Sequence, residues 1–244
     1  MRIAIIGYGK MGKAVEQTAS ARGHEVVCRI DLGSEMQWET LALFEPEVAI
    51  EFTTPESAPE NLTRILKAGI PVVCGTTGWY QHLELIQEIS ERNKGSLVFG
   101  SNFSPGVNLL FSLNAQLASW MKAFPDYDCY IEERHHRMKQ DAPGGTGLSL
   151  AKQIIENNPA KKSWVSGELT NRSLKEGEFS IAYTRAGALP GDHEVTWTSA
   201  IDELSIRHRA FGREGFAMGA VMAAEWLKTH QGFHNFSDIF SELI

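Results

Sequence analysis

The sequence predicts an α/β protein whose first domain is a doubly wound parallel sheet and whose second domain is α+β with a mixed or antiparallel sheet. Two patterns support this prediction. Apolar segments rich in β-branched residues alternate with helical segments up to about residue 105, and alternating apolar and polar side chains follow. The length of 244 residues allows two domains of modest size.

Five apolar segments in the first part of the chain are predicted to be parallel strands, because strands covered by helices on both faces are apolar nearly throughout. They are residues 2–6, 25–31, 48–53, 71–75 and 97–101. The intervening segments 57–68 and 81–93 have the apolar spacing of helices. This alternation is typical of a Rossmann-type sheet.

The second part of the chain has strands of another kind, predicted at residues 179–183, 195–201 and 204–209. Because their alternation leaves one face to cover, we expect a helix at residues 148–155 to pack on it. Any remaining open face, with Trp197 and Tyr183 on it, would be a natural subunit interface. A helix at residues 215–227, rich in small residues, should pack back against the first domain.

The predicted domains are therefore residues 1–105 with 215–244, which bind a dinucleotide, and residues 106–214, which bind substrate and form the oligomer. The formal net charge of −7 argues against a nucleic-acid partner. No apolar run approaches the roughly 18 residues of a membrane span, and no cationic leader precedes the first strand, so we expect a cytoplasmic protein. Cys28, Cys74 and Cys129 are widely spaced and are expected to be buried, inert thiols.

A glycine turn follows the first strand and reads Gly7, Tyr8, Gly9, Lys10, Met11, Gly12. In this pattern the first glycine makes the tight turn, the second lets backbone amides approach a pyrophosphate, and the third lets helix and strand pack closely. The second strand ends in Asp31, 19 residues beyond Gly12, at the place of an acid that binds the adenosine ribose. The alternative is a glycine turn that binds nothing.

Asp31 also bears on the choice of nucleotide, because a carboxylate there repels the extra phosphate of NADP. Leu32 follows it, where an arginine would favour that phosphate. NADH is therefore the expected hydride donor. NADPH stays open because Lys10 and Arg29 are close in sequence.

Two further loops follow predicted parallel strands, at the edge of the sheet where ligands of such folds bind. They contain small, hydroxyl and amide residues that could hydrogen-bond a nicotinamide carboxamide, although each could equally be an ordinary loop. The residues are Gly75, Thr76 and Thr77 in one loop and Gly100, Ser101, Asn102 and Phe103 in the other.

A basic segment at residues 134–139 precedes a glycine-rich helix start, and together they predict an anion-binding site with transferable protons. The amides of Gly145 and Thr146, the Thr146 hydroxyl and cations from His136 and Lys139 would bind the anion. A solvated charged face is the plainer alternative. Metal binding by His135 and His136 is disfavoured, because adjacent residues of an extended chain point to opposite faces.

A second metal site at residues 191–194 with His208 is also disfavoured. His193 is expected at a hairpin turn, and His208 is expected on a polar strand face.

The stretch from Glu132 to Thr146 reads E-x-x-H-H-x-x-K-x-D-A-P-x-G-T. Five other motifs accompany it in order: G-Y-G-K-M-G at residue 7, F-T-x-P at 52, G-T-T-G at 75, N-F-S-x-G-V-N at 102 and R-x-x-F-A-x-G-A from Arg213. Over nearly the whole chain, these motifs resemble the 4-hydroxy-tetrahydrodipicolinate reductase family, also called dihydrodipicolinate reductase, of the diaminopimelate and lysine pathway.

The resemblance implies that His135 is a proton donor or acceptor and that Lys139 donates a proton to the reduced substrate. It implies that His136, Gly145, Thr146 and Arg213 bind the substrate carboxylates, and that the glycine turn, Asp31 and the loops at Gly75 and Gly100 contact the nucleotide. The implied reaction is hydride transfer from NAD(P)H to a cyclic imine dicarboxylate, giving tetrahydrodipicolinate. No metal is implied. A homotetramer assembled through the second sheet is expected, as is a closing motion over substrate.

Three residues depart from the family pattern. Gly144 stands where many members have serine, so one hydroxyl contact to substrate is missing. Leu32 stands where members that use NADP often have arginine, and Glu51 replaces a commoner aspartate without an expected consequence.

Two other functions remain open from the residues. A dehydrogenase of another amino or hydroxy dicarboxylate, such as aspartate, would share the glycine turn but has no need of the H-H-x-x-K motif. A non-catalytic nucleotide sensor that regulates genes would need a basic DNA-reading helix, and no segment of the sequence predicts one.

Overall fold

The computed structural model describes residues 1–31, 33, 35–167 and 172–244, so the expectation for Leu32 lies outside the described residues. The chain divides into two compact units. The first unit is Met1–Pro105 with Arg213–Ile244, and the second is Gly106–Gly212. The chain was expected to return to the first domain at residue 215, but the helix that makes this return already begins at Glu214.

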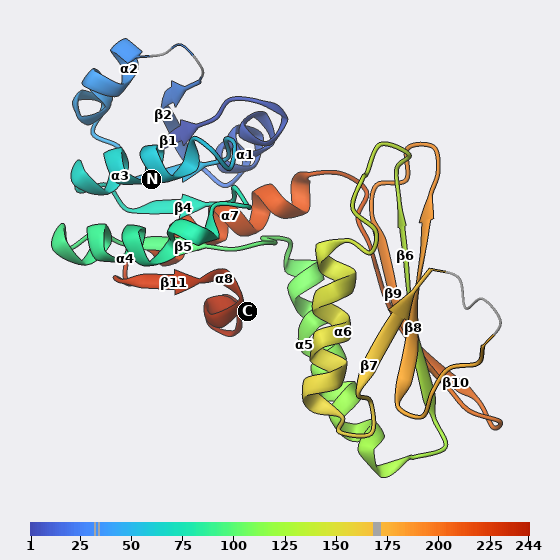
Figure 1. The fold of residues 1–244 in the computed structure, drawn as a ribbon. Coiled ribbons are helices and arrows are strands. Elements are labelled where there is room, and N and C mark those ends of the chain that lie inside the picture. Colours follow the sequence, from blue (N-terminus) through green and yellow to red (C-terminus); the bar gives the residue numbers. More distant parts are fainter. Residues whose placement is uncertain (32, 34, 168–171) are drawn as a thin grey trace. The chain divides into compact units, whose positions relative to one another are not determined.

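The first unit holds a six-stranded sheet in the order β11-β5-β4-β3-β1-β2, with every pair of neighbours parallel (Figure 1). Its strands are β1 (Arg2–Ile6), β2 (Glu25–Ile30), β3 (Val48–Glu51), β4 (Val72–Cys74), β5 (Leu97–Phe99) and β11 (Phe233–Asn235). The predicted parallel sheet is therefore confirmed. The sixth strand, β11, was not predicted, because its three residues are too short to display a period.

Helices bury both faces of this sheet, and alternate residues of β1 enter two separate cores. Ile3 and Ile5 pack with residues of helix α7 (Glu214–Trp226), whereas Ala4 and Ile6 pack with residues of helix α3 (Ala58–Lys67). This two-sided burial explains why the strands are apolar nearly throughout. The helices of this unit are α1 (Lys10–Ala21), α2 (Glu35–Thr40), α3 (Ala58–Lys67), α4 (Leu83–Arg92), α7 (Glu214–Trp226) and α8 (Phe236–Ile239), with short 3-10 turns at Leu41–Phe44, Tyr80–His82 and Phe240–Glu242.

The second unit is a five-stranded mixed sheet in the order β10-β9-β6-β8-β7. Its strands are β6 (Asp128–His135), β7 (Ser163–Ser166), β8 (Glu178–Arg185), β9 (Asp192–Thr198) and β10 (Glu203–Arg209). Strands β6, β8 and β7 run parallel, while β9 is antiparallel to both of its neighbours. The expected mixed sheet is thus confirmed.

Two helices, α5 (Pro105–Trp120) and α6 (Gly145–Asn157), cover one face of this mixed sheet, with a 3-10 turn at Met121–Ala123 after α5 (Figure 1). Their apolar residues, such as Leu110 of α5 and Leu150 of α6, share a core with Ile131, Phe179 and Val195 of the strands. The covering helix predicted near residue 148 is confirmed, whereas α5 was not predicted. No described helix combines the length and the apolar character that crossing a membrane requires.

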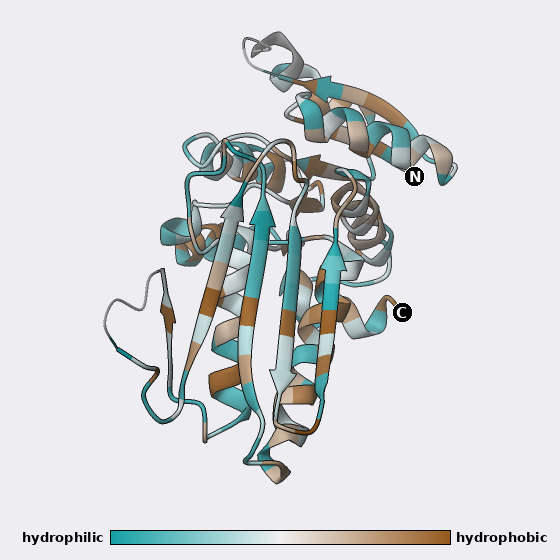
Figure 2. Ribbon diagram, turned by 90° about the vertical axis from the view of Figure 1, so that its right-hand side faces the viewer, coloured by the Kyte–Doolittle hydropathy of each residue, from teal (hydrophilic) through white to brown (hydrophobic). Residues whose placement is uncertain are grey.

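The open face of the mixed sheet differs from expectation (Figure 2). Trp197 is fully buried in the core beneath the helices. Tyr183 follows the core residues Phe179 and Ile181 at every second position of β8 and so shares their helix-covered face, which means that neither side chain lies on the open face. Alternation shows which residues share a face, but not which face the helices cover. The expectation for His193 was also wrong, because it lies inside β9 and is 5% exposed.

Candidate functional site

The glycine turn after β1 has the geometry expected of a phosphate-binding turn. Gly7 has φ +90°, and a Cβ there would come within 2.1 Å of the Phe52 carbonyl oxygen. A Cβ on Gly12 would lie 2.2 Å from the Gly7 carbonyl oxygen, so α1 packs against the turn only because this residue is glycine. Gly9, the N-cap of α1, faces open space. A phosphate group could therefore approach the backbone there.

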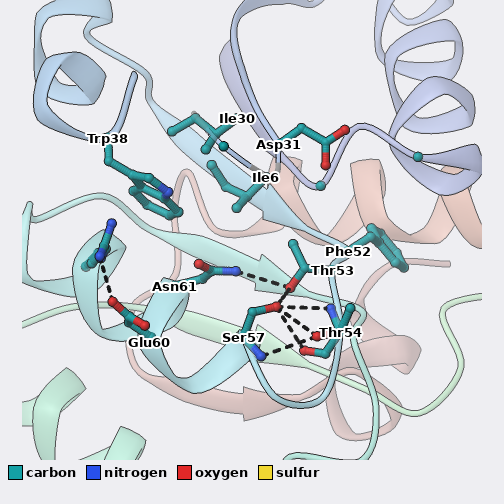
Figure 3. Close-up of a pocket in the computed structure, with 14 residues that line it drawn as sticks. Ile6, Ile30, Asp31, Trp38, Phe52, Thr53, Thr54, Ser57, Glu60 and Asn61 are labelled. Carbon is teal, nitrogen blue, oxygen red and sulfur yellow. Dashed lines mark hydrogen bonds and ion pairs between the residues drawn. The ribbon is translucent and has the colours of Figure 1, made fainter. Parts of the chain in front are cut away.

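A cavity of about 460 Å³ opens beside this turn (Figure 3). Three predicted nucleotide residues, Gly7, Gly9 and Asp31, line it. The other lining residues are Ile6, Ile30, Gly33, Trp38, Phe52, Thr53, Thr54, Ser57, Glu60, Asn61 and Arg64. Its volume lies in the usual range of small-molecule sites, roughly 300 to 1,000 Å³.

The wall of the cavity opposite Asp31 comes from the end of β3 and from α3 (Figure 3). Thr53 accepts a hydrogen bond from Asn61 Nδ2 at 3.1 Å, and its backbone amide donates to Thr76 Oγ1 at 2.7 Å. The loops after β3 and β4 are therefore joined. Thr53 and Thr54 belong to the F-T-x-P motif but were not predicted as site residues.

A buried carboxylate, that of Glu51, hydrogen-bonds to residues at the start of these loops. It is 0% exposed and accepts hydrogen bonds from the Thr53 amide at 3.1 Å and from Cys74 Sγ at 3.0 Å. Burial raises the pKa of Glu51. No consequence was expected for this residue, because a sequence does not show which carboxylate lies beneath the loops of a site.

The remaining predicted nucleotide residues do not line the described cavity. Phe103 is 2% exposed and its ring centroid lies 4.5 Å from that of Phe236, so its side chain belongs to the core. Thr76 is buried as well, while Thr77 and Ser101 are exposed. A Cβ on Gly75 would lie 2.0 Å from the Phe52 ring, so any larger residue there would require this ring to move.

Arg29, which was considered as a partner for an NADP phosphate, is already engaged. Its Nε donates to Glu16 Oε2 at 3.2 Å, its Nη2 pairs closely with the same carboxylate, and its guanidinium lies 5.6 Å from the centre of the Tyr8 ring. The hydrogen bond from Arg29 lowers the pKa of Glu16, which keeps this ion pair intact at neutral pH.

The second unit brings several charged and histidine side chains together at one end of its sheet. Glu133 and His135 are two residues apart on β6, so their side chains lie on the same face of the sheet. In the strand register His193 of β9 lies opposite Glu133, and Arg185 of β8 lies opposite His135. The helix α6 begins nearby at Gly145, with Gly144 as its N-cap. The first amides of a helix have no intrahelical partner, so those of Gly145 and Thr146 can receive an anion.

Glu133 is the centre of this cluster, although it was not predicted as a site residue. It is 0% exposed, and both of its carboxylate oxygens lie 2.9 Å from the Gly144 amide nitrogen. The Arg185 guanidinium pairs closely with the same carboxylate and also donates to the Asp141 carbonyl oxygen. Nothing in the sequence around Arg185 indicates that it belongs to this site, because it lies there only as a result of the pairing of β8 with β6.

The two histidines of the cluster are held neutral by burial. Burial lowers the pKa of His135, an effect that Glu133 partly opposes, and it lowers the pKa of His193 to about 3. Their rings meet edge to face with centroids 4.9 Å apart. Within the described chain, neither ring nitrogen of His193 has a hydrogen-bond partner, and neither does His135 Nδ1.

Glu133, His135 and His193 offer potential metal-ligand atoms within 4.8 Å of one another. The Glu133 carboxylate, however, already binds the Gly144 amide and the Arg185 guanidinium. A second cation beside this guanidinium would be repelled. The cluster therefore fits a network that orients side chains better than it fits a metal centre.

Lys139, the predicted proton donor, lies in the turn between β6 and α6. Its Nζ is 2.7 Å and 2.8 Å from the two carboxylate oxygens of Asp141, and this contact lowers the pKa of Asp141. His136 is exposed in the same turn. Arg213 is exposed at the N-cap of α7 and belongs to the first unit, so the second unit alone does not contain it.

Comparison with known proteins identifies the family. Residues 1–103 match the model for the N-terminus of dihydrodipicolinate reductase, and residues 106–240 match the model for its C-terminus. A protein of Christiangramia forsetii named 4-hydroxy-tetrahydrodipicolinate reductase is 42% identical over 243 residues, covering 100% of this chain and 99% of its own. One of the same name from Archaeoglobus fulgidus is 32% identical, covering 98% and 99%.

A solved structure supports the fold. The dipicolinate-bound dihydrodipicolinate reductase from Paenisporosarcina sp. TG-14 superposes with a TM-score of 0.79 at 23% identity, covering 98% of this chain and 99% of its own. The resemblance predicted from the motifs is confirmed, and so is the prediction of an enzyme. The chain belongs to the dihydrodipicolinate reductase family, whose members are pyridine-nucleotide-dependent oxidoreductases.

Proposed function

We propose that this enzyme reduces the cyclic imine dicarboxylate derived from 4-hydroxy-tetrahydrodipicolinate to tetrahydrodipicolinate, in diaminopimelate and lysine biosynthesis, with NADH as the preferred donor. One observation carries the proposal most directly: His135, Lys139 and the free amides at the start of α6 lie in one unit around Glu133. Such a site can bind the substrate carboxylates, and it can supply a proton to neutralise the negative charge that hydride addition leaves on the substrate.

The glycine turn fits a dinucleotide, because Gly9 leaves open space at the N-terminus of α1 and Asp31 lies at the adjoining cavity. Gly7 and Gly9 would hold the pyrophosphate, and Asp31 would bind the ribose hydroxyls. When bound, the reduced nicotinamide supplies the hydride. The loops at Gly75 and Gly100 would contribute backbone groups toward the nicotinamide end.

In the second unit, the Gly145 and Thr146 amides and the Thr146 hydroxyl would bind one substrate carboxylate, and His136 and Arg213 would assist in binding the carboxylates. Lys139 would deliver a proton to the reduced substrate from its Nζ. In the free enzyme this ammonium group is paired with Asp141. Substrate binding would therefore draw Lys139 from a neighbouring carboxylate. His135, neutral because of burial, would serve as a further proton donor or acceptor.

The preference for NADH is supported by two carboxylates. Asp31 lines the nucleotide cavity, where it would repel a ribose phosphate. Arg29, the nearest alternative partner for that phosphate on β2, is paired with Glu16. An NADP phosphate would have to break this ion pair before Arg29 could bind it.

We also propose that the enzyme is a cytoplasmic homotetramer that assembles through the open face of the mixed sheet (Figure 2). This face carries paired polar groups, including Arg134 with Glu132 at 2.7 Å and Arg207 with Asp192 at 2.8 Å. Assembly through it would bury charge pairs and hydrogen bonds, in contrast to the apolar patch expected from the sequence. Analytical ultracentrifugation of the wild-type protein tests the tetramer.

The proposed reaction is tested by incubating the enzyme with enzymatically generated 4-hydroxy-tetrahydrodipicolinate and either NADH or NADPH. We expect nucleotide oxidation that requires the substrate, with a lower KM for NADH. A parallel reaction with L-aspartate and NAD⁺ tests the rival dehydrogenase. Activity with aspartate alone would reject the proposal, and so would no activity with the generated substrate.

A further inference from the structure

The Glu133 carboxylate is buried between three elements of the second unit, and no catalytic step proposed above uses it. It comes from β6, faces His193 of β9, pairs with Arg185 of β8 and receives the amide of Gly144 at the N-cap of α6. A buried carboxylate is costly unless such partners compensate it. Its position therefore depends on all of these elements being in place.

The same carboxylate determines which amides remain free at the start of α6. Both of its oxygens lie 2.9 Å from the Gly144 nitrogen, so the carboxylate holds the N-cap residue of α6 in place through its backbone amide. The next amides, of Gly145 and Thr146, have no intrahelical partner and remain available to a ligand. Glu133 thus holds the anion-binding turn without occupying it.

The other side of the carboxylate faces the histidine pair. Its oxygens lie 3.9 Å from His135 Nδ1 and 3.9 Å from His193 Nε2. The side chain of His193 is 7% exposed and lacks a partner in the described chain, while its ring meets that of His135 edge to face. His135 is therefore confined between a fixed charge and a neutral ring.

We propose that Glu133 is a positioning residue that fixes His135 relative to the start of α6. The imidazole and the free amides of Gly145 and Thr146 can then contact the same substrate molecule. This inference rests on the proposed function. It adds a residue outside the catalytic and substrate-binding sets. Such positioning matters because a displacement of about 1 Å at a catalytic group can reduce the rate about 100-fold.

The first test is Glu133→Gln, which keeps the shape of the side chain but removes the negative charge that pairs with Arg185. We expect kcat to fall about 10-fold and the KM for the dicarboxylate to rise about 10-fold, while the Kd of NADH stays within about twofold. Glu156→Gln is the matched control, since Glu156 is an exposed acid of α6 in the same unit and pairs at the surface with Lys152. The control should retain wild-type kinetics.

A second variant keeps the charge and moves it. A Cβ on Gly147 would lie 2.8 Å from Glu133 Oε2, so Gly147→Ala pushes the carboxylate away while placing a better helix former in α6. The better helix former offsets part of the cost of displacing this buried carboxylate, so we expect the variant to remain folded at the assay temperature and to lose kcat/KM about 10-fold. It therefore tests the inference even where Glu133→Gln folds poorly.

A third readout does not depend on turnover. Besides Glu133, the charged and titratable groups around the His135 ring are His193, Lys139, Arg185 and Asp141. Glu133 is the acid that favours protonation of His135 most, so in Glu133→Gln the pKa of His135, followed by NMR of its ring, should fall.

The outcomes separate the two claims. A wild-type enzyme without activity on the generated substrate would refute the proposed function, whatever the variants do. An active wild type together with a Glu133→Gln or Gly147→Ala variant of unchanged kcat/KM would overturn the positioning role. An unchanged His135 titration in Glu133→Gln would do the same.

Discussion

Asp31 is the residue on which the expected preference for NADH depends most, and Asp31→Asn isolates its charge. The amide keeps the size and hydrogen-bonding shape of the side chain. Asp31 is exposed at the cavity, so the dielectric constant of water, about 80, applies to its interaction with a ligand. For a phosphate of about two charges at about 5 Å, the repulsion is then about 1.7 kcal/mol, which corresponds to about 16-fold in affinity and sets an upper limit, because salt screens it.

Removing this charge should therefore lower the KM for NADPH about tenfold. Loss of charge-assisted hydrogen bonds to the ribose, worth about 1.5 to 3 kcal/mol with a charged acceptor, should raise the KM for NADH about tenfold or somewhat less, because the amide oxygen still accepts. The ratio of kcat/KM for the two nucleotides should thus shift roughly 100-fold toward NADPH.

Initial rates with both nucleotides at one ionic strength measure this shift, and added salt should reduce it. Glu91→Gln, which neutralises an exposed carboxylate of α4, is the control for net charge. An unchanged nucleotide ratio in Asp31→Asn would refute the reasoning. A wild-type enzyme with a lower KM for NADPH than for NADH would refute it as well.

Three further predictions concern protons, substrate and stability. Lys139→Ala should reduce kcat about 100-fold or more without changing the Kd of NADH, and near-normal turnover would remove Lys139 from the mechanism. Arg213→Ala should mainly raise the KM for substrate, about tenfold, so a loss confined to kcat would contradict a binding role. Burial raises the pKa of Glu51 above its ordinary value of 4.5, so the folded state favours the protonated acid and wild-type stability is lost as the pH rises through that raised pKa. Glu51→Gln cannot titrate, and its melting temperature relative to wild type should therefore increase from pH 4.5 upward; a difference independent of pH would count against this account.

Local patterns in the sequence predict the first unit well. The five apolar strands, the glycine turn and the start of α1 follow from neighbouring residues, and contacts inside one β-α unit decide them. The end of β1 was predicted correctly, and the ends of the other four predicted strands were one or two residues too long. The loops after β3 and β4 begin with apolar or small residues, which extended the apparent strands. The three-residue strand β11 gave no signal at all.

The second unit was predicted less completely, because its site depends on the order of strands in the sheet. Arg185 and His193 reach Glu133 only because β8 and β9 flank β6, and nothing in their own segments indicates that order. The same limit explains the error at Trp197. Its strand alternates as expected, yet the covered face is the one that carries it.

The helix α5 was missed for a physical reason of another kind. Buried polar side chains, Asn108 and Asn114, interrupt its apolar stripe, and exposed apolar ones, Leu109 and Leu113, stand beside them. Asn114 Nδ2 donates to the Leu150 carbonyl oxygen at 3.1 Å, so a contact with α6 accounts for the polar residue. Such a tertiary contact has no trace in local periodicity.

In the proposed reaction, this enzyme transfers a hydride from the nicotinamide to the dicarboxylate bound at the start of α6. The most direct measurement uses NADH that carries deuterium at the transferred position of the nicotinamide ring, with mass spectrometry of the product. We predict tetrahydrodipicolinate heavier by one deuterium, formed in step with NADH oxidation. A product without deuterium, or NADH oxidation without this product, would contradict the account.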